Sequence, residues 1–201
     1  EIRNCDWSSD VCSSDLGRIA VEHLLSKGHR RIGLMVNART ITPQNQDSWR
    51  KRTEGHTLVI TAIGHALREH GLRHALSVHY GQPYDPAHPV PHPPSNPLAE
   101  ASLKPMEAWL RSDHRPTAVI GSDFRLYALG LAAQRVGLRI PDDLELLGMG
   151  NTPYSQACGF DSISFDEPEM ARQIAELVLA DDASLGNASR NIAVTPRLVT
   201  R

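Results

Sequence analysis

The residues best suited to bind a ligand stand at the ends of two apolar runs. Ser122 and Asp123 follow Thr117–Gly121, a β-branched and apolar run that is typical of a buried strand. A second apolar run, Leu144–Leu147, leads into the polar loop Gly148–Tyr154. The carboxyl ends of parallel strands meet at one edge of an open sheet, and ligands bind at that edge. The sequence therefore predicts a small-molecule cleft between these two loops.

The chain between the two loops has the pattern of a helix that joins parallel strands. Its apolar residues recur at helical spacing: Leu126, Leu129, Ala133 and Val136. Ser122 or Asp123 offers a side-chain oxygen to cap this helix, and Gly137 is the expected left-handed stop. Pro141 turns the chain before the second strand begins. The whole stretch is predicted to form a βαβ unit.

Helices and strands alternate along the rest of the chain. The expected elements are a helix from Gly17 to Gly28, a strand at Ile32–Val36, a helix at Arg50–His70, a strand at Leu76–Tyr80, a helix at Leu98–Arg111 broken at Pro105, a strand at Ser162–Phe165, a helix at Glu169–Leu179 and a strand at Ile192–Val199. Asp166 and Glu169 have the spacing of a capping box. This alternation predicts an α/β fold, a parallel sheet with helices on both faces. Residues 1–16 contain Ser-Ser-Asp twice and follow neither period, which indicates a foreign or disordered segment.

The composition limits the possible partners and compartments. Lys and Arg number 21 against 23 Asp and Glu, a formal net charge of −2, so no overall basic field favours nucleic acid or a membrane surface. No apolar run reaches the roughly 18 residues that a membrane span needs, and no signal peptide is visible. Cys5, Cys12 and Cys158 have no Cys-x-x-Cys spacing and give no disulfide framework. We therefore expect a cytoplasmic protein.

Four segments together resemble the regulatory domain of LacI/GalR (lactose-repressor) transcription regulators. They are Gly17–Met35 (GRIAVEHLLSKGHRRIGLM), Arg50–Gly55 (RKRTEG), Pro116–Asn151 (PTAVIGSDFRLYALGLAAQRVGLRIPDDLELLGMGN) and the C-terminal PRLVTR. The combination of EHLLSKGHRRIG with GLRIPDDLELLG is specific to this resemblance, which covers nearly all of 17–201. It implies a periplasmic-binding-protein-like (type I) fold, in which two lobes of parallel sheet flanked by helices hold a sugar-type effector between them.

The family's topology implies how the chain divides. The expected division is residues 1–16 as a foreign or disordered segment and 17–201 as the effector-binding domain, with a first lobe of 17–37 and 163–180 and a second lobe of 38–161 and 190–201. The chain is expected to cross between lobes at Asn37–Thr40 and Phe160–Ile163. The family's helix-turn-helix, hinge helix and first βα units would precede Gly17. The first lobe is therefore expected to be truncated, and operator DNA to be bound only through the absent head.

The resemblance implies an arginine in the effector site. Arg52 stands at the family's Arg-x-x-Gly position, where a planar guanidinium forks onto ligand hydroxyls or a carboxylate, and Arg50 lies beside it. The alternative is a solvated arginine in the first turn of a helix. A cation near a helix N-terminus is disfavoured by the helix dipole, which supports the binding role.

Two further positions match the family's effector site. Ser122 and Asp123 match a polar pair at a strand end, where Asp123 is expected chiefly to cap the helix and Ser122 to contact the ligand. Gly150 and Asn151 stand where many members carry Asp-Asp, whose first aspartate binds the ligand. This departure removes a carboxylate from the cleft. We therefore expect an anionic effector, such as a sugar acid or sugar phosphate, rather than a neutral hexose.

Some residues in loops have a less specific interpretation. Three aromatic residues could stack on a sugar or pack only on their own loops: Trp49, Tyr84 and Tyr154. The spacing of His79, His88 and His92 fits no compact ligand set, so no metal is expected. The family implies a homodimer, with Phe124 and Tyr127 lining either the cleft or the subunit contact.

The resemblance implies ligand-dependent regulation rather than catalysis. The effector would favour one arrangement of the lobes and so control operator affinity. Gly148-x-Gly150 is also typical of a dinucleotide loop, but Pro153 occupies the third glycine position and no helix is expected directly after it. No GxxxxGK[ST], HExxH or GxSxG occurs, so neither an enzyme nor a cofactor is expected. The alternatives are an extracytoplasmic sugar-binding protein of an ABC-type transporter with the same fold, and an α/β hydrolase or sugar isomerase.

Overall fold

The computed structural model describes residues 10–36, 62–72, 76–80, 98–179 and 195–201. Its strands form one sheet in the order β2-β1-β3-β4-β5-β6. Their bounds are β1 Ile32–Val36, β2 Leu76–Tyr80, β3 Ala118–Ser122, β4 Glu145–Met149, β5 Asp161–Ser164 and β6 Arg197–Val199. The strands from β1 to β5 are parallel, whereas β6 runs antiparallel to β5. The expected α/β architecture is confirmed, with an antiparallel strand added at one edge.

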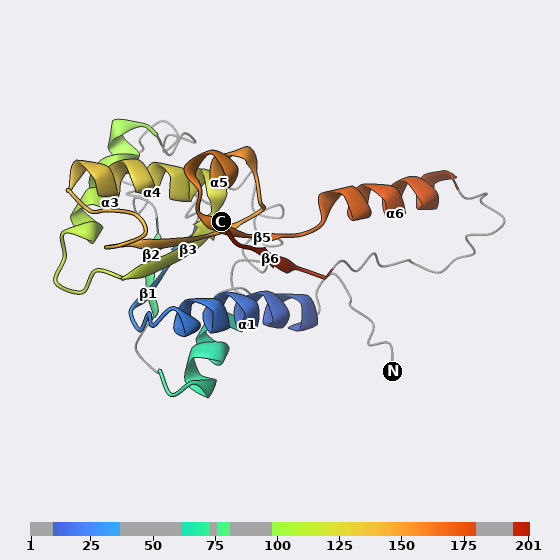
Figure 1. Ribbon diagram of the computed structural model, residues 1–201, viewed down its shortest axis with the longest axis horizontal. Helices are drawn as coiled ribbons and strands as arrows, with labels where there is room; N and C mark the ends of the chain where they lie inside the picture. Colours follow the sequence, from blue (N-terminus) through green and yellow to red (C-terminus); the bar gives the residue numbers. More distant parts are fainter. Residues whose placement is uncertain (1–9, 37–61, 73–75, 81–97, 180–194) are drawn as a thin grey trace, which may run out of the picture.

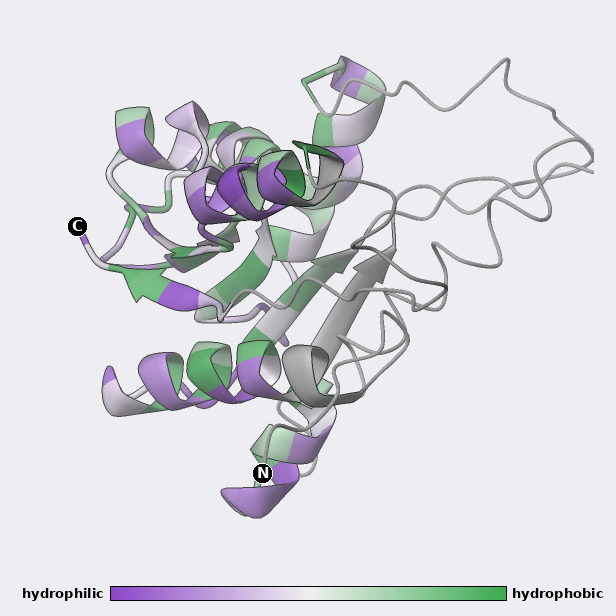
Figure 2. Cartoon of the chain, turned by 90° about the vertical axis from the view of Figure 1, so that its right-hand side faces the viewer, coloured by the Kyte–Doolittle hydropathy of each residue, from purple (hydrophilic) through white to green (hydrophobic). Residues whose placement is uncertain are grey.

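Helices cover both faces of this sheet (Figure 2). The described helices are α1 Asp10–Ser26, a helix at residues 62–69, α3 Glu100–Leu110, α4 Asp123–Arg135, α5 Pro153–Cys158 and α6 Glu167–Leu179. Helix α1 and residues 62–69 pack on one face, and α3 and α4 pack on the other. Helix α6 extends away from the sheet (Figure 1). None of the described helices is long and apolar enough to cross a membrane.

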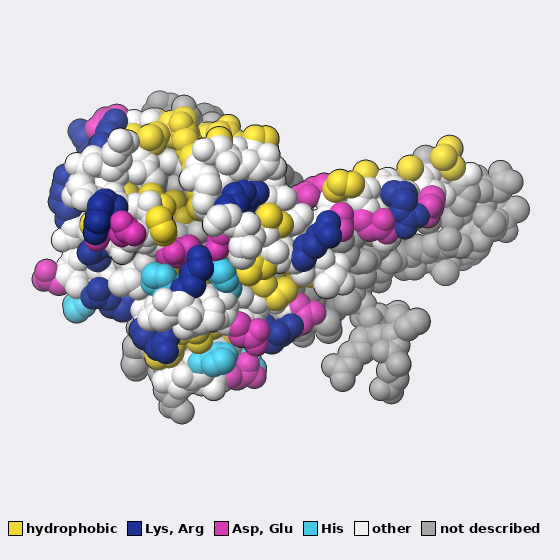
Figure 3. Space-filling view, in the orientation of Figure 1, with side chains coloured by type: hydrophobic (Ala, Val, Ile, Leu, Met, Phe, Trp, Pro, Cys, Tyr) yellow, Lys and Arg dark blue, Asp and Glu magenta, His cyan; other side chains and the backbone are white. Residues whose placement is uncertain are grey.

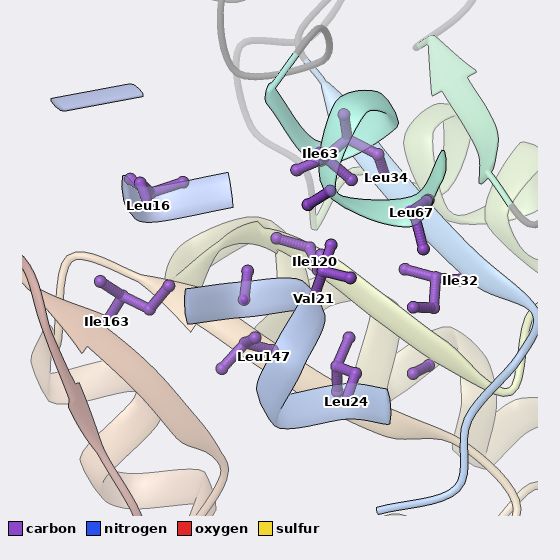
Figure 4. Close-up of a cluster of buried hydrophobic side chains, with 13 residues drawn as sticks. Leu16, Val21, Leu24, Ile32, Leu34, Ile63, Leu67, Ile120, Leu147 and Ile163 are labelled. Atoms are coloured by element: carbon purple, nitrogen blue, oxygen red, sulfur yellow. The ribbon is translucent and has the colours of Figure 1, made fainter. Parts of the chain in front are cut away.

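Strand periodicity divides the core into two clusters, one on each face. Ile32 and Leu34 of β1 join the cluster beneath α1, whereas Met35 joins the cluster beneath α3 and α4, because successive residues point to opposite faces. Figure 4 shows the first cluster, in which Leu24 of α1 packs near Leu147 of β4. Each such side chain contributes roughly 1.5–3 kcal/mol when fully buried.

Several predicted element ends are confirmed and others are wrong. The helix-stop glycines Gly28, Gly71 and Gly137 have positive φ angles of 90°, 75° and 80°. Helix α1 begins at Asp10, so residues 10–16 of the segment expected to be foreign or disordered belong to this helix. Pro105 lies inside an unbroken α3 rather than at a break.

The capping box at the start of α6 is not formed. The backbone N–H of Asp166, which Glu169 would have to bind, donates to Ser164 Oγ at 3.2 Å. The carboxylate of Glu169 instead accepts hydrogen bonds from Arg172 and Gln173 of the same helix. The Glu169 carboxylate therefore binds its i+3 and i+4 neighbours on the helix surface rather than the N-terminus of the helix.

The expected lobe boundary after β1 is wrong. Residues 17–37 were assigned to a different lobe from 38–161, yet β1 pairs with β2 on one side and β3 on the other. Helix α1 shares its core with β1, β3 and β4. The expected crossing at Phe160–Ile163 is also misplaced, because β5 lies inside the sheet and the chain leaves it only after Ser164. Hydrogen-bonded neighbours, rather than chain order, decide which strands share a lobe.

The connections place a topological switch point between β1 and β3. From β1 the sheet continues to β2 on one side, whereas from β3 it continues to β4 on the other. Connections that leave neighbouring strands in opposite directions create a crevice at the carboxyl ends of those strands. Ser122, the last residue of β3, lies at this crevice.

A polar network ties α1 to strands β4 and β5. Lys27 Nζ donates to Glu145 Oε1 at 2.9 Å and to Asp161 Oδ2 at 2.8 Å. His23 Nε2 lies 2.8 Å from the same Asp161 oxygen, and the backbone N–H of Arg201 donates to Oδ1. Burial acts to raise the pKa of Asp161, but these hydrogen bonds outweigh it and hold the pKa below its usual range. The network therefore joins α1, β4, β5 and the end of the chain.

His29 makes the stability of this region dependent on pH. Its Nδ1 lies 3.1 Å from Thr117 Oγ1, and burial lowers the pKa of His29 despite the nearby carboxylate of Glu145. A lowered pKa in the folded chain means that the unfolded chain binds protons first as the pH falls. The contribution of His29 is therefore present above about pH 6.5 and is lost as the pH falls below it.

We expect His29→Gln to reduce the slope of the free energy of unfolding against pH between about pH 8 and 5, because the proton uptake of the unfolded state is removed. Urea denaturation at several pH values measures this slope. His114→Gln changes an exposed histidine outside the network and is the matched control, which should keep the wild-type slope. An unchanged slope in His29→Gln would contradict the assignment.

Candidate ligand-binding edge of the sheet

Ser122 is the exposed residue at the carboxyl end of β3. The four preceding strand residues are buried, so the chain emerges from the core at this position. Ser122 is the N-cap residue of α4, but its side chain makes no capping hydrogen bond. The predicted hydroxyl cap is therefore wrong. Its exposed hydroxyl at the switch point is suited to donate to and accept from a polar ligand.

Asp123 is buried and joins three segments of the chain. The residue is only 1% exposed. Oδ1 accepts a hydrogen bond from Ser162 Oγ of β5 at 2.8 Å. Oδ2 accepts from the backbone N–H of Thr152 at 2.6 Å and from its hydroxyl at 2.9 Å. The expected role as a helix cap is therefore wrong, because this carboxylate is used within the fold. Its contact with a ligand stays a prediction.

The position of the Asp123 carboxylate requires glycine at position 148. A Cβ atom added to Gly148 would lie 2.0 Å from Asp123 Oδ1, 2.8 Å from Ser162 Oγ and 2.9 Å from Phe160 Cε2. Real Cβ atoms do not approach other heavy atoms this closely. The absence of a side chain on β4 thus creates the space that the buried carboxylate occupies.

Asn151 holds the loop after β4 in an unusual conformation. Its φ angle is 48°, in the left-handed region that asparagine tolerates better than most residues. Its backbone N–H donates to Ser162 Oγ at 3.0 Å, and its side-chain Oδ1 accepts from the guanidinium of Arg201. Arg201 also donates to the backbone oxygen of Phe160 at 3.0 Å. Asn151 therefore brings an arginine to this edge, where the sequence suggested only the loss of a carboxylate.

Tyr154 lies in an aromatic cluster rather than in a loop. Helix α5 begins at Pro153, directly after the polar loop, although no helix was expected there. Proline suits the first helical turn because its missing N–H would have no partner there. The ring of Tyr154 lies 4.8 Å from that of Phe124 and 5.5 Å from that of Tyr127 between centroids. Tyr154 is 41% exposed, so the cluster presents an aromatic surface.

The remaining predicted site residues lie outside the described part of the chain. These are Arg50, Arg52, Tyr84 and Trp49, together with His88, His92 and the side chain of His79. Among the described residues, no group of three His, Cys, Asp or Glu side chains could hold a metal ion. Ser162 and Arg201 were not predicted to belong to the site, and Thr152 was included only as part of the loop Gly148–Tyr154. Their spacing from Asp123 carries no periodic signal, because the contacts depend on how β3, β4 and β5 align.

The described residues at this edge can recognise a polar molecule by hydrogen bonding and stacking. Ser122 supplies a hydroxyl, Arg201 a guanidinium and Tyr154 an aromatic face. Because Asp123 is enclosed, the edge gains no carboxylate from it. Such a combination suits hydroxyl-bearing and anionic ligands.

Comparison with known proteins places this geometry among ligand-binding domains. The family described as periplasmic binding protein-like domain matches residues 21–201. The HTH-type transcriptional repressor PurR of Klebsiella pneumoniae subsp. pneumoniae is 26% identical over 188 residues, covering 92% of this chain and 48% of that protein. The chain thus spans about half the length of the curated relatives it matches.

Solved structures share the fold. A LacI transcriptional regulator from a Rhodococcus species is similar with a TM-score of 0.68 at 22% identity, covering 96% of this chain and 61% of that one. A LacI family regulator from Enterococcus faecium with bound ribose gives a TM-score of 0.69 at 19% identity, covering 94% and 62%. The expected periplasmic-binding-protein-like fold is confirmed.

We expect Gly148→Ala to lower the free energy of unfolding by about 1–3 kcal/mol, because the added methyl group forces the Asp123 carboxylate aside. Urea denaturation measures the change. Gly130→Ala in α4 is the matched control: its Cβ would meet nothing closer than 3.5 Å. Alanine also favours a helix over glycine, so this variant should be neutral or stabilised by up to about 1 kcal/mol.

The same clash predicts a coupling between the two positions. In an Asp123→Ala background the shortest contact no longer exists, so Gly148→Ala should be less destabilising than in the wild type. Equal losses in the two backgrounds would show that Asp123 does not occupy the space above Gly148.

Proposed function

Because the chain belongs to the periplasmic binding protein-like domain family, in the form carried by LacI/GalR regulators, we propose that it binds a small polar effector at the carboxyl ends of β1 and β3. The observation that carries this proposal is the exposed hydroxyl of Ser122 at the topological switch point. Segments 37–61 and 81–97 follow β1 and β2 in the sequence and contain Arg50, Arg52 and Tyr84. We assign those three residues to the same ligand.

The proposed effector is a sugar or sugar derivative that carries an acidic group. The Enterococcus faecium relative with bound ribose supports a sugar. The anionic group is supported by the charges: Asp123 is enclosed in the fold, and Asn151 brings Arg201 to the edge. A guanidinium pairs with a carboxylate or phosphate more strongly than with a neutral hydroxyl. The ligand is bound and not transformed.

The proposed mechanism is regulation of operator binding through movement between two lobes. Helix α6 extends away from the sheet after Asp166, whose φ angle is 52°, and it exposes Ile174 and Leu179 (45% and 83%). Such apolar exposure supports a second lobe that packs on α6. An effector that bridges two lobes favours one arrangement by as much as its affinities for the two arrangements differ.

The proposed protein is a cytoplasmic, dimeric transcription regulator that contacts DNA through a part outside this chain. Its match to a curated transcriptional repressor supports this class over a transport protein of the same fold. The partly exposed rings of Phe124 and Tyr127 on α4 supply an aromatic surface for a second copy. Aromatic residues are enriched in the cores of such interfaces.

We expect isothermal titration calorimetry to show tighter binding of gluconate than of glucose, because the arginines pair with the carboxylate. Ser122→Ala should weaken binding by about 1 kcal/mol, since one hydrogen bond is lost. Ser26→Ala, an exposed serine whose hydroxyl donates to His23, is the control and should bind like the wild type. Tighter binding of glucose would reject the acidic effector, and full affinity in Ser122→Ala would reject the site.

We expect Tyr127→Asp to shift the chain from dimer to monomer in sedimentation velocity, because a carboxylate would have to be buried in the contact. Ile140→Asp replaces another partly exposed apolar residue outside the cluster and should leave the dimer intact. A wild-type chain that is monomeric, or a Tyr127→Asp variant that remains dimeric, would contradict this interface.

A further inference from the structure

A hollow lies at the opposite edge of the sheet from Ser122. Its volume is about 390 Å³, and it is formed where α3 and α4 end and where the chain enters β1. Arg31 precedes β1, Arg111 caps α3 and Arg115 precedes β3, so three guanidiniums come from separate segments. Figure 3 shows several Lys and Arg side chains at the left of the view, with Asp and Glu side chains among them.

The hollow has more positive than negative charge. Asp113 is the carboxylate among its lining residues, against the guanidiniums of Arg31, Arg111 and Arg115. Arg111 Nη1 lies 3.5 Å from Glu107 Oε2, which is a long distance for an ion pair. Arg115 Nη1 donates to the backbone oxygen of Asp143 at 3.2 Å. Within the described part of the chain, most of the donors on these guanidiniums therefore remain available for an anion.

The arginine side chains are not needed to bind the backbone carbonyl groups at the helix ends. At the end of α3, the backbone oxygen of Glu107 accepts from the N–H of Arg111, and that of Trp109 accepts from the N–H and hydroxyl of Ser112. The N–H of Arg115 donates to the oxygen of Ser112. These carbonyls are thus already bonded within the chain, so the guanidiniums are not required to satisfy them.

The wall of the hollow also has an apolar part. Leu110 is buried at the end of α3, and Val136 and Leu138 pack against the same cluster after α4. A small ligand gains affinity when an apolar body contacts such a wall while a few polar groups fix its orientation. The guanidiniums together with the leucine and valine side chains therefore favour a ligand that has both an anionic group and an apolar body.

We propose that this hollow binds a small organic anion, with its phosphate or carboxylate group among Arg31, Arg111 and Arg115 and its apolar part against Leu110, Val136 and Leu138. The site is separate from the proposed effector edge, since it lies at the amino ends of β1 and β3. It gives the chain a second ligand-binding position that is independent of the first.

The test uses phenyl phosphate, which combines both features, and follows the backbone amides of the full chain by NMR. We expect shifts at residues 110–115 and 136–138, and little change at 122 and 150–154. Inorganic phosphate should bind at the same residues but more weakly, because it lacks the apolar part. Benzyl alcohol should not bind there, because it lacks the charge.

Variants connect this binding to the arginines. Arg31→Ala removes an exposed side chain and should weaken phenyl phosphate binding about tenfold, as should Arg115→Ala. Arg18→Ala on α1, an exposed arginine paired with Glu22, is the control and should bind like the wild type. Arg115→Ala loses its hydrogen bond to Asp143, so circular dichroism checks that this variant remains folded. If it is unfolded, Arg31→Ala alone decides the result.

Three outcomes would overturn the proposal. They are full affinity in Arg31→Ala, equal binding of benzyl alcohol, or shifts confined to the effector edge. Ser122→Ala separates the two sites, because it should weaken gluconate binding and leave phenyl phosphate binding unchanged. Failure at one site therefore does not obscure the result at the other.

Discussion

The buried carboxylate of Asp123 is the constraint on which the ligand-binding edge depends. It joins the start of α4 to the loop after β4 and to β5, through Thr152 and Ser162. A carboxylate without hydrogen bonds is very costly to bury, so these donors and the side-chain-free Gly148 have to be present together. The loop that carries Asn151 and the start of α5 are consequently held in one arrangement. The edge is a rigid frame in which Ser122 remains exposed.

This arrangement separates the residues that build the site from those that meet a ligand. A carboxylate at a strand end is a natural partner for sugar hydroxyls, but here its oxygens are used inside the protein. The groups that remain at the edge are a hydroxyl, aromatic rings and the guanidinium that Asn151 holds. Their chemistry supports an acidic effector. The arginines at the opposite edge belong to a different surface and reach neither this loop nor α5.

The described strands form one sheet with a hydrophobic core on each face. Both faces of the sheet are covered, and the network of Lys27, Glu145 and Asp161 fixes α1 across β4 and β5. Helix α6 has its own apolar residues and exposes them away from this core. Strand β1 lies between β2 and β3, although the family order of segments suggested a lobe boundary directly after it.

The sequence by itself determined most of the elements, because local patterns encode them. The strands β1 and β2 have the predicted bounds, and glycines with positive φ end the helices as expected, since both features depend only on neighbouring residues. The family resemblance gave the fold class and directed attention to Ser122, Asp123 and Asn151. Only the tertiary structure decided that β1 lies inside the sheet, that Asp123 binds Thr152 and Ser162, and that Arg201 reaches Asn151. These contacts join residues far apart in the chain, and strand order and register, which no local period records, determine whether they meet.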